Sequence, residues 1–176
     1  MRWSAMLFFV FVVGCGGLAV GPFPRTTIPA EIAPPPNQRL EWVVAATGVQ
    51  LYRCDKKRDA SGQFEWAFQA PEARLRDVAG KSFGRHYAGP TWEADDGSKL
   101  VGTVQARVNA TDNSAIPWLR LAGKSAGGAG LLTNVTTILR VSTAGGQAPA
   151  AGCKESEQGQ ILRVDYTSDY YFYVPR

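Results

Sequence analysis

The chain has 176 residues and a mass of 19.0 kDa, which is enough for one globular domain and short for two. Hydrophobic residues make up 45% and charged residues 19%, and 19 glycines and 11 prolines are present. This composition excludes a disordered acidic chain and a coiled coil, and it favours a turn-rich β protein. The net charge is +4, but the basic residues are scattered, which argues against a nucleic-acid partner. With one histidine and three cysteines, we expect no metal site and no cofactor.

The N-terminus has the pattern of an export signal. Arg2 precedes an apolar run, Ala5 to Val13, which is too short for a bilayer-spanning helix of about 20 residues but suits a signal peptide. Val12-Val13-Gly14-Cys15 resembles a bacterial lipobox, so we expect residues 1–14 to be a lipoprotein signal peptide and Cys15 to be lipidated. Gly16 after the cysteine favours the outer membrane. The alternative is an ordinary secretory signal that is cleaved nearby.

A proline-rich segment follows, with six prolines between Gly16 and Gln38. Proline favours extended backbone without hydrogen bonds, so residues 15–37 are interpreted as a tether between the membrane and a domain at 38–176. A proline-rich ligand for a partner protein is the alternative reading of this segment.

The remaining cysteines form an even pair. If Cys15 is lipidated or removed, Cys54 and Cys153 are left in a chain that is bound for an oxidising compartment, and we expect them to form a structural disulfide. Closing a loop of about 100 residues stabilises a fold by up to roughly 4.7 kcal/mol on the chain-entropy model. The alternative is a catalytic thiol with His86 as its base.

Alternating apolar residues predict a series of short strands. In chain order they cover 40–46 and 49–54, which meet at Thr47-Gly48, and then 64–68, 100–108, 118–121, 131–141, 161–167 and 170–174. Asp96-Gly97 indicates a hairpin turn before the run at 100–108, in which Leu100, Val104, Ala106 and Val108 share one predicted face and Arg107 lies on the other. The prediction is a single all-β domain, either an antiparallel β-sandwich or a small barrel.

Several segments together resemble the DUF3455 family over residues 38–174. They are Gly48–Cys54, Ala70–Ala73, His86–Glu93, Ala115–Leu119, Val135–Val141 with Thr143–Gly146, Cys153 and Asp165–Tyr173. The resemblance implies a domain of unknown function found in secreted bacterial and fungal proteins, some of which carry the name malate dehydrogenase. No G-x-G-x-x-G motif follows an early strand, so the residues do not support dinucleotide binding.

The densest group of chemical residues is the segment from His86 to Glu93, followed by Asp95-Asp96. In an enzyme, His86 would act as acid or base, Glu93 as its partner and Tyr87 as a hydrogen-bond donor. In the structural alternative, Tyr87 and Trp92 are core aromatics and His86 satisfies a buried hydrogen bond. The acidic residues lack the spacing of a calcium loop and fit a hairpin turn better.

Aromatic residues offer a second kind of site. Trp92 and Trp118, with Asp95, are the candidate binding residues, and Tyr170-Tyr171-Phe172-Tyr173 would place alternate rings on opposite faces of a strand. The alternative is that these rings fill the core. Two hypotheses follow: a lipid-anchored, non-catalytic envelope module that binds a glycan or an envelope protein near Trp92, and a hydrolase or lyase of an extracellular polymer that uses His86 and Glu93. The binding module is favoured, because no complete catalytic set is present.

Overall fold

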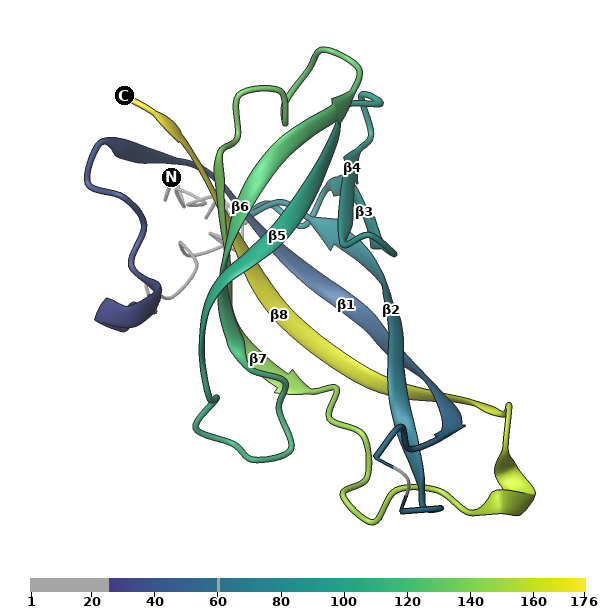
Figure 1. The fold of residues 1–176 in the computed structure, drawn as a ribbon. Helices are drawn as coiled ribbons and strands as arrows, with labels where there is room; N and C mark the ends of the chain where they lie inside the picture. Colours follow the sequence, from purple (N-terminus) through teal and green to yellow (C-terminus); the bar gives the residue numbers. More distant parts are fainter. Residues whose placement is uncertain (1–25, 60) are drawn as a thin grey trace, which may run out of the picture.

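A computed structural model describes residues 26–59 and 61–176, and it is a closed barrel of antiparallel strands (Figure 1). Each strand pairs with the next in the chain, and the last pairs with the first. This confirms the all-β prediction and decides for the barrel over the sandwich. The strands are β1 (Gln38–Lys56), β2 (Phe64–Arg76), β3 (Ser82–Tyr87), β4 (Thr91–Ala94), β5 (Lys99–Val108), β6 (Trp118–Gly127), β7 (Thr137–Gly145) and β8 (Ile161–Pro175).

The long strands β1 and β8 each replace two predicted strands. Thr47 and Gly48 were expected where two runs meet, but they lie inside β1 and pair with both β2 and β8. Gly48 is needed for close strand contact, because a Cβ atom there would lie 2.1 Å from the carbonyl oxygen of Glu72. A glycine in a strand-like pattern therefore marks a close backbone approach here, and not a turn.

A β-bulge in β5 changes which side chains face the interior. The register against β6 shifts between Val104 and Ala106. Val104 and Arg107 consequently line the interior, whereas Ala106 and Val108 pack on the outside. The prediction that Ala106 and Val108 share a face with Leu100 and Val104 was therefore wrong, because a bulge inserts one residue and reverses the alternation.

The end of the expected tether packs against the barrel. Residues 26–37 include a short 3-10 helix, η1 (Ala30–Ile32), and Ile32 is fully buried on the outer wall with Leu139, Val141 and Tyr171. The Arg120 guanidinium donates a hydrogen bond of 2.7 Å to the carbonyl oxygen of Ala33. The predicted signal peptide and the lipidation site Cys15 lie outside the described residues.

A loop closes one end of the barrel. Leu132 and Val135, between β6 and β7, are buried in the interior core. The turn between β4 and β5 holds this loop, since Asp96 accepts a hydrogen bond of 2.7 Å from the backbone of Leu131, and the Ser98 hydroxyl accepts one of 3.2 Å from Leu132. The predicted hairpin turn at Asp96-Gly97 thus helps to seal this end.

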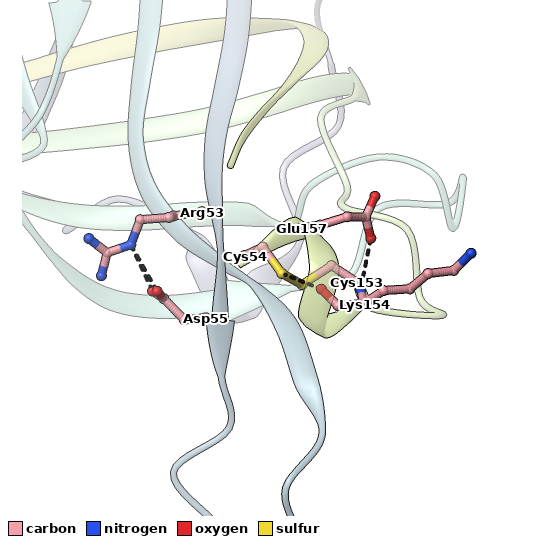
Figure 2. The surroundings of a disulfide bond; sticks show 6 residues. All are labelled: Arg53, Cys54, Asp55, Cys153, Lys154 and Glu157. Carbon is pink, nitrogen blue, oxygen red and sulfur yellow. Dashed lines mark hydrogen bonds and ion pairs between the residues drawn. A yellow bond between two sulfur atoms is a disulfide. The ribbon is translucent and has the colours of Figure 1, made fainter. Parts of the chain in front are cut away.

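The predicted disulfide is present near the other end (Figure 2). It joins Cys54, in β1, to Cys153, in the loop between β7 and β8, across a sequence separation of 99 residues. A second 3-10 helix, η2 (Glu155–Glu157), follows directly. Because both sulfurs are bonded to each other, neither is a free thiol. None of the helices in the described ranges is long and apolar enough to cross a membrane.

Candidate functional site

His86 and Trp92 face each other inside the barrel. They are direct partners across the β3–β4 pair, and their rings stack with centroids 4.3 Å apart. Tyr170 from β8 packs edge-on against both, at 5.1 Å from His86 and 5.3 Å from Trp92. Gly102 in β5 makes room for the indole, because a Cβ atom there would lie 2.7 Å from it. The three rings form a buried aromatic floor.

His86 is a neutral, hydrogen-bonded residue of this floor. It is 2% exposed, and its Nδ1 donates a hydrogen bond of 2.8 Å to the carbonyl oxygen of Thr91. Burial lowers the pKa of His86 to about 3, the Thr91 hydrogen bond opposes the shift, and the positive charge of Arg140 adds to it. The imidazole is therefore uncharged at neutral pH.

We expect His86 to make the free energy of unfolding fall as the pH drops from 7 to 5. The pKa of His86 is about 3 in the folded chain and 6.5 ordinarily, so between these values the unfolded chain takes up a proton that the folded chain does not. The free energy of unfolding therefore has its full value above pH 6.5. Below that pH it falls by about 1.4 kcal/mol per pH unit, which amounts to about 2 kcal/mol between pH 7 and pH 5.

Urea unfolding at both pH values measures this effect. His86→Gln is the control, because His86 is the only histidine in the chain and the variant keeps every carboxylate. An equal pH dependence in the variant and the wild type would show that His86 is not responsible.

Glu93 lies on the outer face of the barrel, away from His86. Glu93 pairs with Arg85 across β3 and β4, next to the pair of His86 and Trp92. Successive residues of a strand point to opposite faces of the sheet, so Glu93 and Arg85 point outward where His86 and Trp92 point inward. The Tyr87 hydroxyl donates to Glu93 at 2.7 Å, and Arg85 forms an ion pair with Glu93 at 3.0 Å. The Tyr87 hydrogen bond is the largest cause that lowers the pKa of Glu93. The structure therefore joins Tyr87 to Glu93 and leaves His86 apart from both.

The three candidate binding residues lie in three different places. Trp92 is 1% exposed at the floor of the interior. Trp118 packs on the outer wall, partly buried beside the cluster that contains Ile32. Asp95 is exposed in the turn between β4 and β5. Only Trp92 belongs to the cavity described next.

A cavity of about 570 Å³ occupies the barrel above the aromatic floor. The β3–β4 hairpin is short (Figure 1), and it pairs with β2 only over residues 73–76 and with β5 only over residues 99–101. The cavity lies beyond its tip, between β2 and β5, and extends to the loops that follow β5 and β7. Its lining residues are Gln50, Tyr52, Phe68, Gln69, Pro71, His86, Gly89, Pro90, Trp92, Val104, Arg107, Ile116, Pro117, Leu119, Leu121, Arg140, Gln147 and Tyr170.

Polar side chains in the cavity have unused hydrogen-bonding capacity. Gln50 Nε2 and Trp92 Nε1 are buried and make no hydrogen bond to any residue that the structure describes. Arg140 donates from Nε and Nη2 to the carbonyl oxygen of Pro117, at 3.1 and 2.8 Å. The unpaired nitrogens have almost no accessible surface, so they lie within the cavity wall, and the arginines are the polar groups that a ligand could meet.

The two cavity arginines, Arg107 and Arg140, were not predicted from the sequence. Each is an isolated basic residue in a strand, and only the barrel brings them to one cavity. Within the described ranges, no group of three His, Cys, Asp or Glu side chains is arranged to hold a metal ion.

Comparison with known protein families finds a match over residues 34–174, to the family described as "Protein of unknown function (DUF3455)". The chain belongs to the DUF3455 family. The resemblance predicted from the sequence is thereby confirmed, and every residue that lines the cavity lies within the DUF3455 region. The searches of curated proteins and of solved structures found no match.

Proposed function

We propose that this DUF3455 protein is a non-catalytic binding module of the bacterial cell envelope, and that its ligand enters the barrel cavity. The observation on which this depends is the cavity of about 570 Å³, which has a buried aromatic floor, an apolar rim and two arginines in its wall. Sites for compact organic ligands have volumes of about 300–1,000 Å³, and they combine apolar walls with a few polar groups.

The shape of the cavity favours the end of a glycan over an envelope protein. Trp92, the residue around which binding was predicted, is 1% exposed beneath the cavity, so a ligand would contact the exposed ring of Phe68 at the rim instead. The apolar face of a sugar ring can pack on such an aromatic side chain. A protein surface would meet only the rim of the cavity.

The positions of His86 and Glu93 support binding without turnover. General acid–base catalysis requires groups within reach of the same substrate, and these two lie on opposite faces of the sheet. No aspartate or glutamate is among the described residues that line the cavity, so the pair of carboxylates typical of glycoside hydrolysis is not assembled there.

The envelope location rests on the N-terminal pattern. Lipidation at Cys15 would attach the chain to a membrane, with Gly16 favouring the outer membrane, and part of the proline-rich segment would connect the lipid to the barrel. Multiple acyl chains would give a firm anchor where a single chain binds weakly.

The test is retention of the detergent-solubilised full protein on insoluble wall and extracellular polysaccharides, with measurement of both retained protein and released sugar. We expect retention without sugar release. Phe68→Ala, at the cavity rim, should weaken retention several-fold, because Phe68 is 53% exposed and offers apolar contact to a ligand.

Ile161→Ala is the matched control, since Ile161 is 55% exposed and lies outside the cavity. Equal retention of both variants would place binding elsewhere on the molecule. Released sugar would support the hydrolase or lyase instead, and no retention on any polymer would contradict glycan binding.

A further inference from the structure

Arg107 and Arg140 flank one wall of the cavity. Arg107 pairs with Leu119 across β5 and β6, and Leu119 pairs with Arg140 across β6 and β7. Neighbouring strands are about 4.8 Å apart, so the two arginine backbones are roughly 10 Å apart in one row. The same row continues to Tyr170 of the aromatic floor. Both arginines therefore meet the same volume from adjacent positions.

The positive charge of these arginines is not neutralised by the protein in this volume. Neither arginine forms an ion pair with any described residue, and Arg140 has only a neutral carbonyl group, that of Pro117, as its hydrogen-bond acceptor. Arg140 is partly buried, so a missing counter-charge is costly there and an anionic ligand would offset that cost. Arg107 is exposed and adds positive charge beside the same cavity.

The two arginines offer only hydrogen-bond donors. A guanidinium has five N–H groups and no acceptor, so Arg107 and Arg140 present donors to the cavity. A ligand that pairs with them must be rich in acceptors.

Much of the remaining wall is apolar, although Gln69 and Gln147 also line it. It includes two exposed side chains at the rim, Phe68 and Val104, and the deeper residues Ile116, Leu119 and Leu121. Apolar walls favour a ligand body with a flat or apolar surface. They also favour a single negative charge over two, because the cost of removing a group from water rises steeply with its charge.

We propose that the cavity binds an organic carboxylate attached to a ring, with the carboxylate between Arg107 and Arg140 and the ring against the exposed apolar side chains of Phe68 and Val104. This inference rests on the proposed use of the cavity as the binding site. Two sources share the chemistry: an acidic sugar at the end of a glycan, and a free aromatic acid.

The experiment is calorimetric titration of the full protein in detergent with two matched pairs of probes: galacturonate against galactose, and benzoate against benzyl alcohol. The carboxylate from the true source should bind at least about tenfold more tightly than its neutral partner, because hydrogen bonds between charged groups are the stronger kind. Galacturonate binding would indicate the sugar source, and benzoate binding the free acid. Phenyl phosphate, if it bound more tightly than either carboxylate, would overturn the assignment to carboxylates.

Arg107→Gln should remove most of the preference for the carboxylate, and its exposed position leaves the fold intact. Arg74→Gln is the matched control, because Arg74 is also an exposed strand arginine, and it lies outside this cavity. Arg140→Lys tests the second arginine and keeps its charge; weaker carboxylate binding is expected, since lysine lacks the planar fork.

The outcomes separate this inference from the proposed function. Equal binding of neutral and charged probes would overturn the assignment of the ligand as a carboxylate. An equal loss of carboxylate affinity in Arg107→Gln and Arg74→Gln would overturn it as well. Retention on polysaccharides without binding of either carboxylate would also overturn it and leave the binding module in place. Carboxylate binding without retention on any polymer would support the inference and remove the glycan from the proposed function.

Discussion

Replacing Trp92 with alanine is expected to lower the free energy of unfolding by about 3–5 kcal/mol. Trp92 is among the largest fully buried side chains, and it contacts His86, Tyr170 and Phe172 through ring packing. Its removal leaves a void that four strands of a closed barrel cannot fill by small movements. Urea unfolding monitored by circular dichroism measures the loss.

Two variants control for this result. Trp66→Ala removes the same side chain from a half-buried position outside the core clusters, and we expect a smaller loss. Trp92→Phe keeps an aromatic ring and should recover part of the stability. Equal losses for Trp92→Ala and Trp66→Ala would mean that the aromatic floor does not contribute specially to the fold.

The double variant Cys54→Ser/Cys153→Ser is expected to be less stable than the wild type by about 2–5 kcal/mol. The disulfide closes a loop that contains most of the barrel, so its loss enlarges the conformational freedom of the unfolded chain. It also releases the loop between β7 and β8, which contributes Gln147 to the cavity. Thermal and urea unfolding measure the effect.

Reduction of the wild-type protein provides the control. A thiol reductant should lower the stability of the wild type toward that of the double variant, and it should leave the double variant unchanged. If the oxidised wild type and the double variant unfolded at the same urea concentration, the disulfide would have no net effect on the stability of the barrel.

Much of the fold followed from local patterns in the sequence. The alternation of apolar residues predicted the region of most long strands, and the hairpin at Asp96-Gly97 lies where its turn dipeptide indicated. The predicted strand at 131–141 was wrong over residues 131–136, which form the loop before β7. The disulfide followed from cysteine count and expected compartment. Thr47-Gly48 was misread, because a glycine that permits close strand contact has the same local pattern as one near a turn.

The outer wall shows why burial could not be assigned from alternation alone. Tyr170 and Phe172 face the interior, and Tyr171 lies on the opposite face of β8, yet it is also only 7% exposed. Ile32 covers it, from a segment predicted to be a tether. Alternation along a strand assigns side chains to two faces of the sheet. Whether a face is then buried depends on segments far away in the chain that pack over it.

The candidate site was only partly predictable for a related reason. The sequence singled out His86 and Trp92, and the structure brings them together at the aromatic floor. Glu93 was grouped with His86 because they are near in sequence, but strand alternation places it on the outer face. Arg107 was assigned to the wrong face, because the bulge after Val104 reverses the alternation and leaves no clear signal in the residues.

By itself, the sequence determined the all-β class, the DUF3455 family and the pairing of Cys54 with Cys153, because each depends on residue type, spacing or count. Only the tertiary structure decided the closure of the barrel, the cavity and the meeting of Arg107 with Arg140. These depend on strand register and on contacts between residues distant in the chain, and one bulge is enough to move a side chain from one face of a sheet to the other.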